Sequence, residues 1–156
     1  MTPTLDDLLE ALEDVDDATR EEAAKALADL GDPKTVDPLV SACGDDFWSV
    51  RAYAGCALAK IGGPKALEAL IGLFNDAIME VRNQAVEAAA KMGPSVVDRM
   101  IAALKDERWR VREHAAKTCG EVREKKAVDA LIVACRDRDG AVKSAAAEAL
   151  GKIGDP

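Results

Sequence analysis

The chain has 156 residues, of which 49% are hydrophobic, 32% are charged and only 3% are aromatic, and its formal net charge is −8. Because alanine and leucine supply most of the apolar residues, the composition favours close-packed helices over a β-sandwich. The acidic balance argues against a nucleic-acid partner, and no apolar run is long enough to cross a bilayer.

The first predicted helix covers about residues 5–12, where Leu5, Leu8, Leu9 and Leu12 form one stripe of an amphipathic helix. Residues 1–31 contain ten acidic residues and only two basic ones, so this segment carries a charge of −8 by itself. We interpret it as a solvated acidic N-terminal cap, with an acidic docking surface as the alternative. No signal peptide follows Met1, and we expect a cytoplasmic protein.

The same apolar spacing returns four more times along the chain, at a period of about 31 residues. The later stripes fall in residues 36–43, 67–74, 97–104 and 128–135. Each stripe is followed by an aspartate and then, five residues later, by a Val-Arg-like pair that begins a second predicted helix. The aspartates are Asp14, Asp45, Asp76, Asp106 and Asp137, and the pairs are Thr19-Arg20, Val50-Arg51, Val81-Arg82, Val111-Arg112 and Val142-Lys143. A period of this size predicts a solenoid of stacked helix pairs.

In the second helices, small residues such as Gly55 and Ala59 are expected to let neighbouring helices approach closely. Each aspartate is expected to pair with the arginine six residues later in its own repeat, which would make a structural ladder rather than a catalytic site. Gly-Pro linkers are expected to end the units. The linker after the third unit is one residue short, and Arg123-Glu124-Lys125 replaces the Gly-Asp-Pro linker of the fourth, so we expect a less sharp turn there.

The segment Val50–Pro64 resembles the HEAT repeat of the phycobilisome-lyase-like type, and the likeness extends over the whole chain. The resemblance implies an all-α fold: an α-solenoid of five two-helix repeats, about ten helices, in a right-handed superhelix. The expected repeats, within a single domain of residues 1–156, are about 1–31, 32–62, 63–93, 94–124 and 125–156. In such proteins the second helices line the concave face and contact partners.

Aligning the repeats predicts which second-helix residues point away from the core. Both tryptophans, the only tyrosine and the only histidine fall among them, in repeats 2 to 4, as the residues of a binding surface often do. The predicted partner-binding residues are Trp48, Tyr53, Met79, Gln84, Glu87, Trp109, Arg110, Glu113 and His114. The alternative is that Trp48 and Trp109 only cover the start of their own helices.

We expect no catalytic residues, no metal and no cofactor. His114 has no second histidine to share a metal or a triad, and the four cysteines form no CxxC pair. Cys43, Cys119 and Cys135 fall at core positions, whereas Cys56 is expected to be exposed near Trp48 and Tyr53. A surface cysteine without a role is the preferred interpretation of Cys56, and a reactive thiol is the alternative.

These features predict a non-catalytic scaffold for protein–protein interaction that binds neither nucleic acid nor membrane. The alternative is a subunit of a bilin lyase or a related tetrapyrrole-handling protein; an artificial consensus repeat protein is a third interpretation. The last helix exposes Ala147 and Gly151 and runs into a linker-like Gly154-Asp155-Pro156. Either the chain is a fragment of a longer array, or a partner or a second copy covers this end, which would allow self-association.

Overall fold

The computed structural model describes residues 1–154, and these residues form helices and turns with no strand. The ten α-helices are α1 (Leu5–Ala11), α2 (Asp17–Leu30), α3 (Val36–Ala42), α4 (Trp48–Ile61), α5 (Pro64–Leu73), α6 (Met79–Lys91), α7 (Val97–Ala103), α8 (Trp109–Val122), α9 (Val128–Ala134) and α10 (Gly140–Ile153). Short 3-10 turns at Pro33–Thr35, Gly93–Val96 and Lys125–Ala127 precede α3, α7 and α9. The all-α prediction is confirmed. Asp155 and Pro156, the last residues of the predicted linker, lie outside the described part of the chain.

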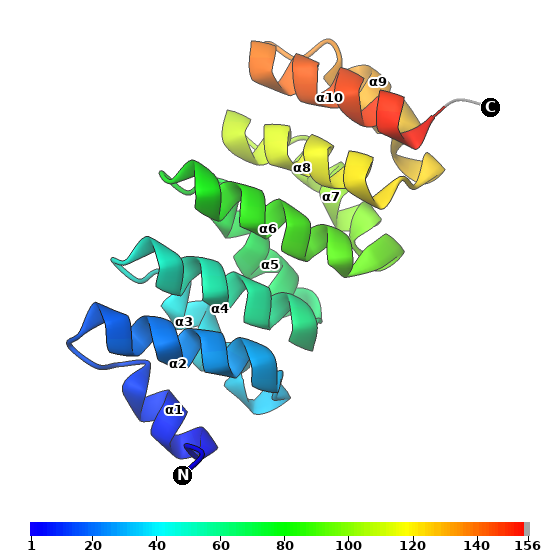
Figure 1. Cartoon of the computed structure of the whole chain (residues 1–156). Coiled ribbons are helices and arrows are strands. Elements are labelled where there is room, and N and C mark those ends of the chain that lie inside the picture. Colours follow the sequence, from blue (N-terminus) through cyan, green and yellow to red (C-terminus); the bar gives the residue numbers. More distant parts are fainter. Residues whose placement is uncertain (155–156) are drawn as a thin grey trace.

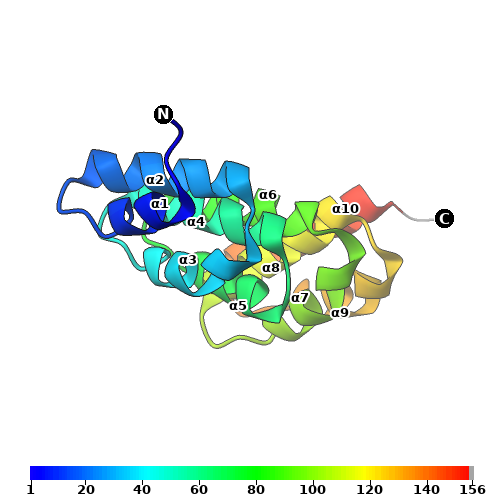
Figure 2. The same cartoon turned by 90° about the horizontal axis from the view of Figure 1, so that it is seen from below.

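The helices stack as five pairs in chain order, with the N-terminus at one end of the stack and the C-terminus at the other (Figure 1). The longer second helices α2, α4, α6, α8 and α10 lie side by side as one layer. The shorter helices α3, α5, α7 and α9 lie behind them, on the other side of the molecule (Figure 2). Each pair buries its apolar stripes between the layers, with Leu27, Leu58 and Met100 fully buried. The arrangement is a helical solenoid.

The turn after α8 differs from the expectation of a weaker bend. Arg123 adopts φ 61 and ψ 31 there, nearly the values of Gly31 at the end of α2, which are φ 62 and ψ 32. Arg123 is the one residue other than glycine with positive φ in residues 1–154. The helix therefore ends in the same left-handed cap although the glycine is missing, because packing of the next pair imposes the turn on a less suited residue.

Small residues of the second helices do allow close packing between repeats. A Cβ added to Gly120 would lie 2.8 Å from the Cα of Ala149 in α10, and one added to Gly55 would lie 2.8 Å from Leu73 Cδ1 in α5. Both distances are too short for a methyl group. The contact at Gly120 joins neighbouring second helices as expected, whereas the contact at Gly55 reaches the first helix of the next pair.

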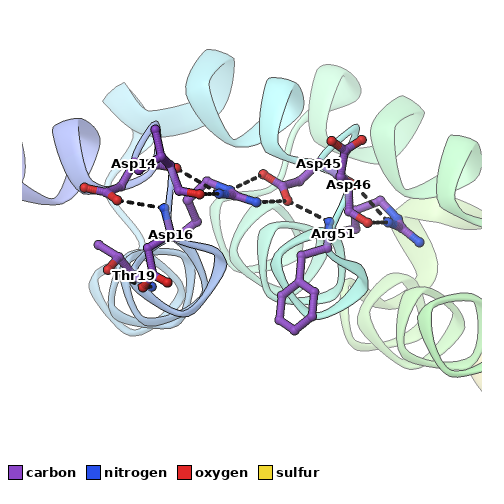
Figure 3. A network of polar contacts seen from close by, with 9 residues as sticks. Asp14, Asp16, Thr19, Asp45, Asp46 and Arg51 are labelled. Carbon is purple, nitrogen blue, oxygen red and sulfur yellow. Dashed lines mark hydrogen bonds and ion pairs between the residues drawn. The ribbon is translucent and has the colours of Figure 1, made fainter.

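The expected ladder of charges exists, but its partners differ from the prediction. Three of the four arginines bind the carboxylate of the following repeat: Arg20 Nε lies 2.8 Å from Asp45, Arg51 Nε 2.7 Å from Asp76 and Arg112 Nε 2.9 Å from Asp137. The aspartate of the same repeat offers only its backbone carbonyl, to which Arg51 Nη1 donates at 2.8 Å at Asp45. Figure 3 shows this alternation at Asp45, whose carboxylate accepts from Arg20 and whose backbone carbonyl accepts from Arg51. The ladder thus ties repeat 1 to 2, 2 to 3 and 4 to 5.

One step of the ladder is missing, between repeats 3 and 4. Arg82 Nη1 still donates to the carbonyl of Asp76 at 2.6 Å, but its Nε is buried and has no partner among the described residues. Asp106 accepts instead from Nε and Nη2 of Arg108, both at 2.9 Å. The linker that is one residue short lies between Arg82 and Asp106. These two residues therefore lack the separation of 25 positions that the other arginine–aspartate pairs share.

Candidate functional site

Large apolar side chains recur at the first residue of three successive second helices. Trp48, Met79 and Trp109 begin α4, α6 and α8, and their exposed fractions are 39%, 63% and 41%. Ile78, which precedes Met79, is also exposed. We call Trp48, Ile78, Met79 and Trp109 the apolar ridge. The side chains are exposed because the chain turns there from the first-helix layer into the second, so the first turn of each second helix lies at a corner of the stack.

Sequence reasoning missed Ile78. The sequence could have indicated it, because Phe47 is a second large apolar residue at the same position, directly before α4. Phe47 itself is half-buried. Ile132 was expected in the apolar stripe of residues 128–135, and this placement was wrong, because Ile132 is exposed on α9. Val133, which sequence reasoning did not single out, is exposed on the same helix, away from the second-helix layer. These two residues do not join the ridge.

Tyr53 lies one turn and a half beyond Trp48 on α4 and is half-buried. Trp48 and Tyr53 together line a small pocket of about 120 Å³. Its other lining residues are Glu21, Phe47, Ser49, Ala52 and Gln84, so the pocket lies where α2, α4 and α6 meet.

A larger groove of about 450 Å³ runs between α4 and α6. Its charged lining residues are Lys60, Glu80, Glu87 and Lys91, and Gln84 borders both this groove and the small pocket. Gln84 Nε2 donates to Glu80 Oε1 at 3.0 Å. The two hollows are therefore neighbours, one with aromatic walls and one with walls of mixed charge.

Cys56 lines the larger groove and is half-buried rather than exposed as expected. Burial raises the pKa of its thiol, and nearby Lys91 opposes this effect only in part. The thiol is therefore protonated at neutral pH, which disfavours the interpretation of Cys56 as a reactive nucleophile.

At the repeat 4 end of the surface, Arg110 and Glu113 contact other side chains of α8, although Arg110 Nε is buried without a hydrogen-bond partner among the described residues. The guanidinium of Arg110 lies 5.1 Å from the ring centroid of Trp109, in cation–π contact. Glu113 Oε1 accepts from Lys117 Nζ at 2.7 Å. Trp109 is thus half-covered by its own neighbour, and a partner at this point would meet both the indole and the guanidinium.

His114 was expected on the exposed surface with these residues, and this placement was wrong. The side chain is buried, with 2% exposed, because it points from α8 toward the preceding repeat. The centroids of the His114 and Phe74 rings are 6.1 Å apart. Its Nδ1 lies 2.7 Å from the carbonyl of Arg110. Burial lowers the pKa of His114, and the carbonyl contact only partly offsets this. His114 is a neutral core residue at neutral pH.

Metal ligation and membrane insertion can be checked for the described part of the chain. Within residues 1–154, no three His, Cys, Asp or Glu side chains are grouped so as to hold a metal ion. No helix in the same range is long and apolar enough to span a membrane.

Several solved structures share this fold at low sequence identity. The MAST/Orbit N-terminal domain matches with a TM-score of 0.74 and 16% identity over 98% of this chain and 84% of that one. The complex of CpcE and CpcF of phycocyanin lyase from Nostoc sp. PCC7120 matches with a TM-score of 0.62 and 20% identity over 98% of this chain and 66% of that one. A designed armadillo repeat protein in complex with the peptide (KR)4 matches with a TM-score of 0.52 and 21% identity over 96% and 82%. At these identities the likeness concerns the fold alone.

The sequence itself matches no curated protein. It does match the family model for HEAT repeats, over residues 5–90 and 97–156. The stacked helix pairs and this match over most of the chain agree. The chain belongs to the HEAT-repeat family.

Proposed function

We propose that this chain is a non-catalytic scaffold that binds a segment of another protein, in the cytoplasm, along its second-helix face. The observation that carries the proposal is the apolar ridge. Trp48, Met79 and Trp109 occupy the same position in three successive repeats and remain exposed although the core is already filled. Large exposed apolar side chains in a row, with charged residues around them, are typical of the centre of a binding surface.

The predicted residues would have different roles in this surface. The apolar ridge and Tyr53 would be covered by the partner and would supply most of the affinity, because aromatic residues gain most when water is removed from around them. Gln84, Glu87 and Arg110 would form the polar rim, where contacts set the register of the partner. His114 is excluded from direct contact by its burial.

A preformed surface also suits this role. Helices fixed by buried ladder pairs lose little conformational freedom when a partner binds, so less of the contact energy is spent on ordering. Repeat proteins of this fold can hold peptides, as the designed armadillo protein solved with (KR)4 does.

The test is affinity capture from the extract of source cells with the wild-type chain and a Trp48→Ala/Trp109→Ala variant as baits. We expect a protein that the wild type retains and the variant loses. The matched control is Val133→Ala, which removes an exposed apolar side chain from α9, outside the proposed surface. Circular dichroism must show both variants folded. If the wild type and the double variant retain the same proteins, the proposal is wrong and the tryptophans only cover the start of their own helices. The contact of Trp109 with Arg110 on the same helix would then be the whole role of that indole.

A second candidate function is that of a subunit that handles a bilin or related tetrapyrrole. The observation that favours it is the structural likeness to the CpcE–CpcF complex of a phycocyanin lyase. Aromatic side chains such as Trp48 and Tyr53 could stack on a tetrapyrrole. Titration with phycocyanobilin, followed by visible absorbance, tests this function: a saturable spectral change that is lost in Trp48→Ala would support it over the scaffold.

A further inference from the structure

The small pocket on the second-helix face has an unusual combination of walls. Its volume is about 120 Å³, close to that of a single side chain. Two walls are the aromatic side chains of Trp48 and Tyr53. Glu21, from α2, is the one charged residue in its lining, and no basic residue lines it. A carboxylate beside aromatic rings is an environment that attracts a cation.

A second observation at the same place is a hydroxyl group without a partner. Ser49 lies in the first turn of α4 and lines the pocket, and its side chain is 5% exposed. Its Oγ is buried and has no hydrogen-bond partner among the described residues. Buried polar groups are nearly always hydrogen-bonded, so an unpaired hydroxyl in the wall of a pocket points to a polar group that the pocket receives.

Two arginines next to the pocket are bound to carboxylates outside it. Arg20, next to Glu21 on α2, donates to Asp45, and Arg51 of α4 donates to Asp76. On the α6 side, Gln84 gives its amide N–H to Glu80, which leaves its carbonyl oxygen as an acceptor. These two arginines are thus engaged elsewhere. Lys25, one turn after Glu21 on α2, is exposed and does not line the pocket, which presents acceptors.

We propose that this pocket receives the cationic side chain of a lysine or arginine of the bound segment. The inference rests on the proposed scaffold function and names the chemistry of one recognised residue. The aliphatic stem lies against Trp48 and Tyr53, and the charged head reaches Glu21 and donates to Ser49 Oγ. A neutral or acidic side chain of similar length lacks one or more of these contacts.

The test is a nuclear magnetic resonance titration of the isotope-labelled chain with four short peptides, acetyl-Gly-X-Gly-amide with X as lysine, arginine, glutamine or leucine. We expect saturable shifts of the Trp48 indole N–H and of the Ser49 and Tyr53 amides with lysine or arginine at millimolar concentration, and binding at least about fivefold weaker with glutamine or leucine. Comparison of the first two peptides shows which cation fits better. Equal binding of all four peptides, or no shifts at these residues with any of them, would overturn the proposal.

Two variants locate the effect. Glu21→Gln should weaken lysine or arginine binding by about fivefold or more, whereas Glu22→Gln, the next residue on α2 but outside the pocket lining, should leave it unchanged. Ser49→Ala should weaken it as well, with the amide spectrum otherwise intact. Equal effects of Glu21→Gln and Glu22→Gln would show general attraction to the acidic N-terminal repeat and would contradict a pocket.

The same variants separate this inference from the scaffold function. If a captured partner is lost with Trp48→Ala/Trp109→Ala but retained at full affinity by Glu21→Gln, the scaffold stands and the cation pocket is wrong. If the peptides bind in the pocket but no partner depends on the tryptophans, the pocket stands and the wider surface is wrong.

Discussion

Arg112 donates from Nε and Nη2 to both carboxylate oxygens of Asp137, at 2.9 and 3.0 Å, across the boundary between repeats 4 and 5. The two residues are 25 positions apart. Because the arginine also donates to the carbonyls of Asp106 and Glu107, it joins the loop of its own repeat to the loop of the next. A charge pair of this kind transmits stability from one repeat to its neighbour.

Removal of this link should be costly. Arg112→Ala leaves Asp137 without its partner and frees two carbonyls, and we expect a loss of about 3 kcal/mol in the free energy of unfolding. The matched control is Arg82→Ala, because within residues 1–154 Arg82 has no carboxylate partner and its Nε is already unpaired. We expect about 1 kcal/mol for the control. Urea denaturation of both variants measures the difference, and equal losses would show that the carboxylate link adds nothing.

The packing of Gly120 against α10 predicts a position-dependent effect of alanine. Gly120→Ala places a methyl group 2.8 Å from Ala149 Cα, and separating α8 from α10 should cost about 1–3 kcal/mol. Gly151 holds the corresponding position one repeat later, where a Cβ would meet nothing within 4 Å. Gly151→Ala should therefore be neutral or stabilising by up to about 1 kcal/mol, from helix propensity alone. Thermal melting of the two variants checks the contrast; destabilisation of similar size in both would contradict it.

His114 makes stability depend on pH in the mildly acidic range. Burial lowers its pKa in the folded state, so the unfolded chain takes up the proton first as the pH falls. Above the unfolded pKa of about 6.5, His114 has no effect on the pH dependence of stability. As the pH falls from there toward the folded pKa, His114 lowers the free energy of unfolding progressively. We expect the midpoint of urea denaturation to decrease between pH 7 and pH 5, and His114→Gln to remove most of this decrease. A variant with the wild-type pH profile would assign the dependence to other groups.

The aspartates of the ladder act at lower pH. Hydrogen bonds from Arg108 lower the pKa of Asp106 to about 2. For Asp45 and Asp76, burial works against ionisation, but the hydrogen bonds from Arg20 and Arg51 outweigh it and lower both pKa values. A carboxyl group with a lowered folded pKa stabilises the fold above its unfolded pKa of about 3.9, and this stability is lost as the pH falls through the folded value.

We therefore expect unfolding on acidification below about pH 4, measured by circular dichroism. In Arg108→Ala, carbon-detected magnetic resonance of the Asp106 carboxyl should show its pKa rising toward the ordinary value. An Asp106 pKa that stays near 2 in this variant would assign the lowering to the other groups near it, the backbone N–H of residue 108 and the charge of Arg99.

Much of the architecture was predictable because it depends on local periodicity. The spacing of apolar residues predicts a helix and most of its buried face. The alignment of repeats likewise predicts that the first residue of the second helices is exposed. Trp48, Met79 and Trp109 could therefore be placed on the surface from their alignment alone. The period itself specified a stack of helix pairs, because a single pair cannot bury its apolar faces by itself.

The tertiary structure decided which residues of neighbouring repeats contact each other. These contacts depend on how far each helix pair is shifted relative to the next pair in the stack. The sequence places Arg51 six residues from Asp45 and 25 from Asp76, and only the stacking shows that the more distant carboxylate receives the side-chain pair. The same displacement buries His114 against Phe74 and brings Glu21, Ser49 and Gln84, from three different helices, around one pocket. Local sequence determines which face of a helix is apolar, but the offset between rigid, close-packed neighbours determines which side chains meet.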